Sequence, residues 1–341
     1  MKKTRRFLGI MMAAAMVCGM AGCAAPAKET TSAGTPAAET TAAETKAEAE
    51  AKTEAAASET GAESTGEKLL VGVLVYNDKN EYIQKLLAGA KEKCDEYGYD
   101  MVSYSADKDT AKEVTNMEDV LSLKPGVIIY NPVDSDAAEA TVSLANAAGV
   151  PVITVDREAN GGDIAAHIAS DNVYGGELAG KYVEELLGDN GGQVVEIQGQ
   201  AGTSAARDRG EGFHNIVDKN SKIEVVASQI GNWDKAEAMA IMENSLQAYP
   251  DVKAVFAHSD QMALGAMEAC NNAGKKDIYI VGFDADDDAV AAVKNGDMAA
   301  TIEQLPTLMG EKGIEIAHEF LSGNAPDKYQ TVEVNLITTK D

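Results

Sequence analysis

Polar side chains follow the short aliphatic runs of this chain, at the points where those runs end. The exits are Asn77-Asp78, Asn131-Pro132, Asp156-Arg157, Gln198-Gly199, His258-Ser259-Asp260, Phe283-Asp284 and Glu303-Gln304. In open α/β sheets the ligand binds outside the carboxyl ends of the strands. If the aliphatic runs are parallel strands, the sequence predicts a polar binding site to which both halves of the chain contribute.

The residue types at these exits suit a small polyol. A carboxylate accepts hydrogen bonds from neighbouring hydroxyls and a guanidinium donates them, and bonds to ionised groups are the stronger kind. Asp156 and Arg157 supply both groups at one exit, and Trp233, the single tryptophan, offers an aromatic face for the C–H side of a ring. The alternative is structural: Asp156 and Arg157 would form an ion pair between domains, and Trp233 would lie in a core.

The sequence gives little support for a phosphate-binding, hydrolase or calcium site. Gly176–Lys181 resembles the tail of a phosphate-binding loop but lacks the Ser or Thr after the lysine. No Gly-x-Ser-x-Gly elbow occurs, and no histidine has an obvious nucleophile beside it. The run from Asp284 lacks the Gly and Glu of an EF-hand loop, so Asp286–Asp288 is expected to be favourable charge at a helix N-terminus. We therefore predict no catalytic residue, no cofactor and no metal.

Two kinds of segment alternate from Lys68 onward and position these exits. Amphipathic helices, such as the one whose apolar stripe runs from Ile83 to Tyr97, lie between continuous aliphatic runs. Such runs are typical of strands covered on both faces, and they are Leu69–Tyr76, Val127–Tyr130, Val152–Val155, Val194–Ile197, Val225–Val226, Ala254–Ala257, Ile278–Val281 and Ala300–Ile302. Three strand–helix units precede about residue 170 and four follow. We expect an α/β protein with two doubly wound parallel-sheet domains around one cleft.

The N-terminal residues predict export and a lipid anchor. Residues 1–23 have a basic start and an apolar stretch that ends in Met20-Ala21-Gly22-Cys23, which looks like a bacterial lipoprotein signal cut before Cys23. Acyl chains on Cys23 would hold the protein at the outer face of the cytoplasmic membrane, whereas ordinary secretion is the alternative. Residues 24–67 are rich in Ala, Glu, Thr, Ser and Lys without an apolar face, and we expect a disordered tether there.

Charge and cysteine usage narrow the class of protein further. The net charge of −26 makes nucleic acid a poor partner, because its binding needs clustered cations. After the signal no apolar run approaches the roughly 20 residues that span a bilayer. Cys94 and Cys270 fall on apolar stripes in different halves, so we expect buried thiols rather than a disulfide.

Several longer segments carry a family resemblance. They are His167–Asn172, Gly202–Arg207, Met262–Ala266, Val281–Asp284 and Ala299–Ile302. From about Leu69 to Lys340 the chain resembles the periplasmic ribose-binding proteins, within the type I (ribose/galactose/allose) sugar-binding proteins of ABC transporters. The resemblance implies an N-terminal lobe of residues 68–170 plus 305–333 and a C-terminal lobe of residues 171–304 plus 334–341. Three crossings near Ser170, Gln304 and Glu333 would form a hinge that closes around the ligand.

The resemblance also implies which side chains contact the sugar. The charged and amide positions of the family are intact, and they are Asn80, Asp156, Arg157, Arg209, Asp284 and Gln304. Phe side chains that clamp the sugar ring in the family correspond to Tyr82, Ile83 and Trp233, and a contacting Asn corresponds to Ser259. Since Ile83 lacks a ring and Ser259 is shorter than Asn, another pentose or an allose-like hexose rivals ribose as the ligand.

The function implied by the resemblance is binding, not catalysis. A monomer would capture a monosaccharide, ribose first, and deliver it in the closed form to a separate permease and its ATPase. A transcriptional repressor would need a basic N-terminal helix-turn-helix, which residues 1–67 do not offer. A sugar-modifying enzyme and a sensor that signals to a receptor kinase are the open alternatives.

Overall fold

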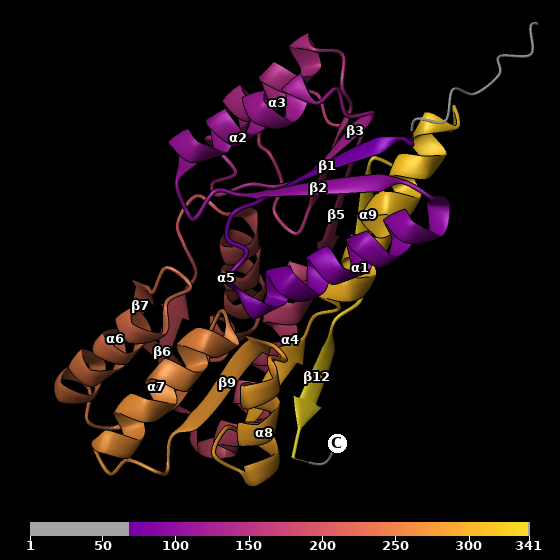
Figure 1. Ribbon diagram of the computed structural model, residues 1–341. Coiled ribbons are helices and arrows are strands. Elements are labelled where there is room, and N and C mark those ends of the chain that lie inside the picture. The colour runs from indigo at the N-terminus through magenta and orange to yellow at the C-terminus, as the bar shows by residue number, and fades with distance from the viewer. Residues whose placement is uncertain (1–67, 340–341) are drawn as a thin grey trace, which may run out of the picture. The chain divides into compact units, whose positions relative to one another are not determined.

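The computed structural model describes residues 68–339, so the predictions for the signal peptide 1–23, Cys23 and the tether 24–67 lie outside the described residues. The described part contains two six-stranded sheets, each covered by helices on both faces (Figure 1). This confirms the predicted α/β class with two doubly wound sheets.

The first sheet has the strand order β11-β5-β4-β3-β1-β2, and all neighbouring strands are parallel. Its strands are β1 (Leu70–Val75), β2 (Asp100–Ser105), β3 (Val127–Asn131), β4 (Val152–Val155), β5 (Ala166–Ser170) and β11 (Tyr329–Val332). One face packs on α1 (Glu81–Tyr97) and α9 (Pro306–Leu321), and the other on α2 (Thr110–Ser122) and α3 (Ala138–Ala147).

The second sheet repeats this order as β12-β10-β9-β8-β6-β7, with only β12 antiparallel to its neighbour. Its strands are β6 (Gly192–Gln198), β7 (Ile223–Ile230), β8 (Val252–Ala257), β9 (Tyr279–Asp284), β10 (Ala300–Glu303) and β12 (Asn335–Thr338). One face packs on α4 (Asn172–Leu187) and α5 (Ser204–Val217), and the other on α6 (Lys235–Ala248), α7 (Asp260–Asn272) and α8 (Asp287–Asn295). A single turn of 3₁₀ helix, Gly188–Asn190, follows α4.

The chain connects the two sheets three times. It leaves the first sheet after Ser170, returns after Glu303 into α9, and leaves again between Val332 and Asn335. These connections support the lobe boundaries that we propose, 68–170 plus 305–333 and 171–304 plus 334–341. Below, "first lobe" and "second lobe" mean these two sets of residues.

Buried side chains agree with two further predictions from the sequence. Cys94 and Cys270 are buried free thiols, as predicted, because each faces a sheet from its helix. Asp286 is the N-cap residue of α8, and Asp287 and Asp288 lie in its first turn, where the helix dipole favours negative charge. Among the described helices, none combines the length and the apolar character needed to cross a bilayer.

Candidate functional site

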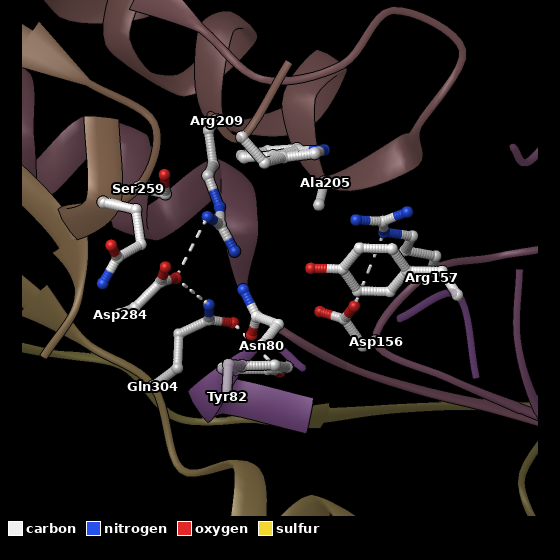
Figure 2. A pocket seen from close by; sticks show the side chains of 12 residues that line it. Asn80, Tyr82, Asp156, Arg157, Ala205, Arg209, Ser259, Asp284 and Gln304 are labelled. Carbon is white, nitrogen blue, oxygen red and sulfur yellow. Dashed lines mark hydrogen bonds and ion pairs between the residues drawn. The ribbon is translucent and has the colours of Figure 1, made fainter. Parts of the chain in front are cut away.

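A pocket lies where the carboxyl ends of strands from both sheets come together (Figure 2). Of the ten side chains predicted to contact a sugar, all but Ile83 line it. The complete lining is Tyr76, Asn80, Tyr82, Asp156, Arg157, Ala205, Arg209, Trp233, Ser259, Gln261, Asp284 and Gln304. The sheet order in each lobe explains this convergence, because ligands of doubly wound sheets bind at the point where the strand order reverses.

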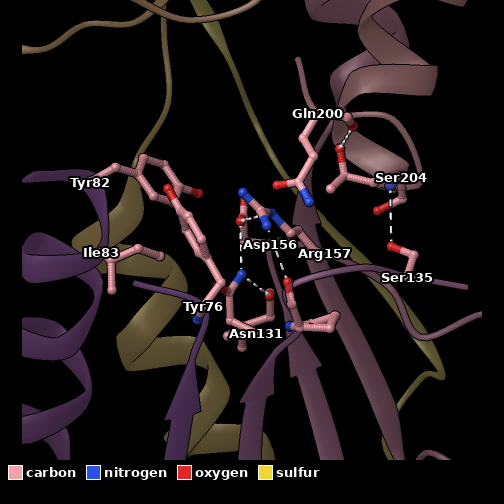
Figure 3. Close-up of polar contacts among 12 residues, drawn as sticks. Tyr76, Tyr82, Ile83, Asn131, Ser135, Asp156, Arg157, Gln200 and Ser204 are labelled. Carbon is pink, nitrogen blue, oxygen red and sulfur yellow. Dashed lines mark hydrogen bonds and ion pairs between the residues drawn. The ribbon is translucent and has the colours of Figure 1, made fainter. Parts of the chain in front are cut away.

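Asp156 and Arg157 form one wall, directly after β4. Asn131, the last residue of β3, donates from Nδ2 to Asp156 Oδ2 at 2.8 Å (Figure 3). Arg157 donates from Nη1 to the carbonyls of Pro132 and Val133 at 3.2 and 3.1 Å. These bonds hold both charged groups within the first lobe, so the structural alternative of an ion pair between domains does not describe Asp156 and Arg157.

The Arg157 guanidinium also lies over the Tyr76 ring, 3.8 Å from its centroid. Tyr76 follows β1 and is buried, and burial raises its pKa to about 12. Its phenol is therefore neutral at physiological pH. The stacked ring restricts the guanidinium plane, which leaves its remaining N–H groups in a fixed direction for a ligand oxygen.

Arg209, Asp284 and Gln304 form the opposite wall. Arg209 Nη1 lies 3.4 Å from Asp284 Oδ1, and Gln304 Nε2 donates to the same oxygen at 2.6 Å. Arg209 also donates from Nε to Asn172 Oδ1 at 2.9 Å and from Nη1 to the carbonyl of His258, and its guanidinium covers the Phe283 ring at 3.7 Å. The wall reaches the first lobe through Tyr82, whose hydroxyl donates to Gln304 Oε1 at 3.4 Å.

The charges in the pocket balance when Asp284 is ionised, since two carboxylates and two guanidiniums are then among the lining residues. Burial raises the pKa of Asp284 to about 7, although the Arg209 charge beside it acts in the opposite direction. Burial likewise raises the pKa of Tyr82 well above its usual value. A neutral ligand that both donates and accepts hydrogen bonds fits this arrangement better than an ion does.

Two of the amide and hydroxyl residues also cap helices that point at the pocket. Asn80 Oδ1 accepts from Ile83 N at 3.3 Å and caps α1, while Ser259 Oγ accepts from Met262 N at 3.4 Å and caps α7. Capping fixes these side chains at the helix ends, so part of their hydrogen-bonding capacity is used by the protein itself.

Three lining residues have backbone conformations that side chains rarely adopt. The φ angles are 64° at Asp156, 56° at Trp233 and 122° at Asp284. Each such conformation costs about 1–3 kcal/mol and persists only where the surroundings enforce it, which is common at ligand clamps. The segment after Asp284 is held by the buried Asp260 side chain, which accepts from Asp286 N at 2.8 Å and from Thr301 Oγ1 at 2.7 Å.

The structure corrects the prediction that Ile83 clamps the sugar. Its side chain is fully buried in the core of the first lobe and is not among the pocket-lining residues. The reason is the position of each residue around the helix. Asn80 caps α1, so the side chain of Tyr82 lies at the pocket, whereas that of Ile83 packs into the core of the first lobe (Figure 3).

Tyr76, Ala205 and Gln261 line the pocket but were not predicted. Tyr76 is the last residue of an aliphatic run, and Gln261 lies two residues after Ser259. If the polar segments Asn77-Asp78 and His258–Asp260 had been extended by one residue, they would have included both. Ala205 carries no polar side chain, and no chemical signal distinguishes it.

Two α/β lobes with a buried, charge-balanced polar pocket between them define a two-lobed ligand-binding protein. A family model described as "Periplasmic binding protein domain" matches residues 71–325, and the chain belongs to this family. The ribose import binding protein of Salmonella typhimurium is 43% identical over 267 residues, which are 78% of this chain and 90% of that protein. The ribose import binding protein of Bacillus subtilis is 39% identical over 274 residues, 80% of this chain and 88% of that protein.

Solved structures of the same kind are also similar. An ABC transporter solute-binding protein of Mycobacterium smegmatis with bound glycerol has a TM-score of 0.77 at 30% identity, and the match covers 81% of this chain and 96% of that one. A periplasmic solute-binding protein of Actinobacillus succinogenes with bound D-allose has a TM-score of 0.76 at 28% identity, covering 80% and 98%.

Proposed function

We propose that this chain is the solute-binding component of an ABC importer and that it captures a monosaccharide, ribose first, between its two lobes. The observation that carries the proposal is the convergence of Asp156 and Arg157 from one lobe with Arg209 and Asp284 from the other around one pocket. The names of the curated relatives, ribose import binding proteins at 39–43% identity, support ribose as the first choice.

A second ligand class is another pentose or an allose-like hexose. Ser259 favours it, because a serine that already caps α7 leaves more room and offers less reach than an asparagine. D-apiose import binding proteins, 33% and 32% identical, and the relative solved with D-allose are in keeping with such variation.

Binding without turnover fits the side chains of the pocket. No histidine or cysteine is among the lining residues. The neighbouring His258 faces away, since its Nε2 lies 3.0 Å from the fully buried carboxylate of Glu196. A pocket of this composition can hold hydroxyls but offers no nucleophile with a base beside it.

The location and the partners follow from the same proposal. The protein would act outside the cytoplasm, as a monomer, anchored through an acylated Cys23 to the outer face of the cytoplasmic membrane. It would pass the closed, loaded form to a membrane permease and its ATPase. Retention of a Cys23→Ser variant in the membrane fraction would contradict the anchor.

A thermal-shift screen over pentoses and hexoses, followed by calorimetry, tests the ligand. Only a sugar that binds the native state raises the melting temperature, through mass action. D-ribose is expected to give the largest shift, and the Asp156→Ala variant is expected to give none while it remains folded. A wild-type protein that no monosaccharide stabilises would overturn the proposal, and product formation from ribose or nucleosides would show catalysis instead.

A further inference from the structure

Tyr76 brings to the pocket a hydroxyl that the described part of the protein does not use. The side chain lines the pocket, and 5% of the residue is exposed. Its hydroxyl has no hydrogen-bond partner among residues 68–339, yet it is not one of the unpaired polar atoms that these residues close off from water. The oxygen therefore keeps a surface that a ligand atom can touch.

The hydroxyl lies within reach of both walls of the pocket. The Tyr76 ring extends beyond the end of its strand and carries the hydroxyl at its far end (Figure 3). Burial is the main reason that the pKa of the phenol rises to about 12. The Arg157 charge lowers this pKa, and Asp156 and Asp284, one carboxylate from each wall, raise it further. Charges from both lobes thus act on the same oxygen.

Contacts on both sides of Tyr76 fix the direction of the phenol. Asn131 Oδ1 accepts from Tyr76 N at 3.4 Å, and the same side chain donates from Nδ2 to Asp156 Oδ2 at 2.8 Å. The Tyr76 carbonyl accepts from Lys108 N at 2.8 Å, and the ring stacks on the Arg157 guanidinium. Because Asn131 is fully buried, one amide holds the phenol and the Asp156 carboxylate in a constant arrangement.

The phenol adds a neutral donor to a wall of charged groups. With a pKa of about 12 it keeps its proton through the neutral range, so it donates one hydrogen bond. Asp156 accepts from Asn131 and has further lone pairs to offer to the pocket. A sugar hydroxyl can accept from the phenol and donate to such a carboxylate at the same time, whereas an ether oxygen can only accept.

We propose that the Tyr76 hydroxyl donates a hydrogen bond to one hydroxyl oxygen of the bound sugar, which makes Tyr76 a specificity-determining residue of the pocket. This inference rests on the proposed function and deepens it. A ligand gains the bond only if it presents a hydroxyl at the end of β1, so a sugar that lacks this hydroxyl gains nothing from Tyr76.

Tyr76→Phe tests the contact, because it removes the hydroxyl and keeps the ring on Arg157. The probe is D-ribose, or the monosaccharide that stabilises the wild type most in the thermal-shift screen. Its affinity in calorimetry is expected to fall about 3- to 10-fold, the usual effect of one net hydrogen bond. The melting temperature without sugar should not fall, because the hydroxyl has no partner within residues 68–339. A fall would show a structural role and overturn the inference, as would equal affinities of the two proteins.

Tyr104→Phe is the matched control. Tyr104 is half-buried on β2 of the same lobe and does not line the pocket. Removal of its hydroxyl should leave the affinity for the sugar unchanged. An equal loss in both variants would overturn the inference, because the effect would then not depend on a contact in the pocket.

The monodeoxy analogues of the same sugar identify the contacted hydroxyl. The analogue that lacks it should bind wild type and Tyr76→Phe with equal affinity, whereas the other analogues should keep the 3- to 10-fold difference. A difference that is the same for every analogue would overturn the inference, because no single hydroxyl would then depend on Tyr76.

The dependence on pH separates Tyr76 from Asp284. The phenol stays protonated between pH 6 and pH 9, whereas Asp284 titrates near pH 7. The ratio of wild-type to Tyr76→Phe affinity should therefore stay above one throughout this range, and a ratio of one at pH 9 would overturn the inference. Failure of every monosaccharide to bind wild type would overturn the proposed function together with this inference, whereas equal binding to wild type and Tyr76→Phe overturns this inference alone.

Discussion

At the scale of single residues, the protonation of Asp284 controls the hydrogen bonds that the pocket can offer. Only 12% of its side chain is exposed, and burial raises its pKa to about 7 against the influence of Arg209. The ionised carboxylate accepts hydrogen bonds from ligand hydroxyls, and such charged bonds are about twice as strong as neutral ones. A protonated Asp284 has lost one of these acceptor sites.

Sugar affinity should therefore fall with falling pH. If the ionised form of Asp284 is the binding form, the apparent affinity decreases about tenfold between pH 8 and pH 6, as the carboxyl takes up its proton near pH 7. The Asp284→Asn variant should bind at least about tenfold more weakly at pH 8 and show a flat profile. Calorimetric titration with D-ribose at half-unit steps of pH measures both effects.

Glu113 provides the matched control. Its pKa is also raised to about 7 by burial, but it lies on α2 and is not among the pocket-lining residues. Glu113→Gln keeps a side-chain oxygen that can accept from Val133 N, so the loop stays supported and the variant should keep the wild-type dependence of affinity on pH. A flat profile in this variant would show that some other property of the fold, rather than Asp284, controls binding.

The sequence was informative at this scale where the signal was local. Asp156 and Arg157 come directly after an aliphatic run and Asp284 lies three residues after another, and that pattern sufficed to place them at strand ends. It could not show that Asn131 holds Asp156, because the partner lies 25 residues away. The prediction that Ile83 contacts the sugar was wrong, because a position in a family motif does not give the direction of the side chain. That direction follows from where α1 begins, which the Asn80 cap sets.

At the scale of elements, the same carboxyl connects α2 to the loop after β3. Glu113 Oε1 accepts from Val133 N at 2.7 Å, and the side chain is buried. Val133 and its neighbour Pro132 in turn accept the hydrogen bonds of Arg157. The helix therefore supports the loop that orients one wall of the pocket.

Glu113 should also make the stability of the fold depend on pH. The folded state keeps the proton up to about pH 7, whereas an unfolded Glu loses it near its ordinary value of 4.5. The folded state thus binds more protons between these values, and stability falls as pH rises through this window, by roughly 3 kcal/mol from this group. Glu113→Gln should abolish this contribution to the pH dependence of the unfolding free energy. Urea denaturation of both proteins at pH 5, 6, 7 and 8 would measure the difference. Equal slopes for the two proteins would contradict the assignment.

Arg209 depends on a close pair of helices. Gly176 of α4 lies against α5 so tightly that a Cβ there would be 2.2 Å from the carbonyl oxygen of Arg209. The sequence predicts that Gly176 lies within a helix. The structure shows that the absence of a side chain there lets the backbones of α4 and α5 approach closely. Close approach of the two backbones sets where α5, and with it Arg209, lies relative to Asn172 and Asp284.

Gly176→Ala should weaken sugar binding more than it weakens the fold. The added methyl meets backbone and must displace α5, which costs about 1–3 kcal/mol of stability and moves Arg209, so affinity should fall at least about tenfold. Gly180→Ala is the control on the same helix pair, because its Cβ would meet Ile216 Cβ at 2.9 Å and the carbonyl oxygen of Phe213 at 3.1 Å, one turn of α5 beyond Arg209. It should lower the denaturation midpoint with little change in affinity. Similar affinity losses in both variants would argue against specific positioning.

The strands that the sequence did not predict are those whose hydrophobic residues show only a weak pattern. β2 is an edge strand without a fully buried residue, and β5 mixes His and Ser with apolar residues. β11 and β12 have four residues each and take their conformation from the sheets that they join. Their hydrophobic patterns are too short to be separated from loop, whereas the long buried runs of the central strands were recognised.

At the scale of the whole described molecule, hydrogen bonds join the two lobes beside the pocket. Ser135 N donates to Gly202 O at 2.9 Å. Ser135 Oγ accepts from Ser204 N at 3.2 Å (Figure 3). Ser204 Oγ in turn accepts from Glu158 N at 3.0 Å. Ser135 and Ser204 are buried, so these bonds are protected from water.

An ion pair joins the lobes elsewhere. Lys85 Nζ of α1 lies 3.2 Å from Asp287 Oδ1 of α8, and the Asp287 side chain is 86% exposed. Exposed pairs contribute about 0–1 kcal/mol and are screened by salt, whereas a buried hydrogen bond contributes about 1 kcal/mol and leaves a costly unpaired group when broken. The serine contacts should therefore dominate the closed arrangement.

Affinity for sugar should follow these contacts even though neither Ser204 nor Lys85 lines the pocket. A ligand that binds between the lobes favours the closed state, so a variant that destabilises closure lowers the apparent affinity by the same factor. Ser204→Ala is expected to weaken D-ribose binding about fivefold, and Lys85→Ala less than twofold, with a still smaller effect in 0.5 M salt than in 0.05 M. Small-angle scattering should show a larger mean radius of gyration for sugar-free Ser204→Ala than for wild type. If Lys85→Ala proves the more damaging change, exposed charge rather than the buried contact between Ser204 and Glu158 holds the lobes together.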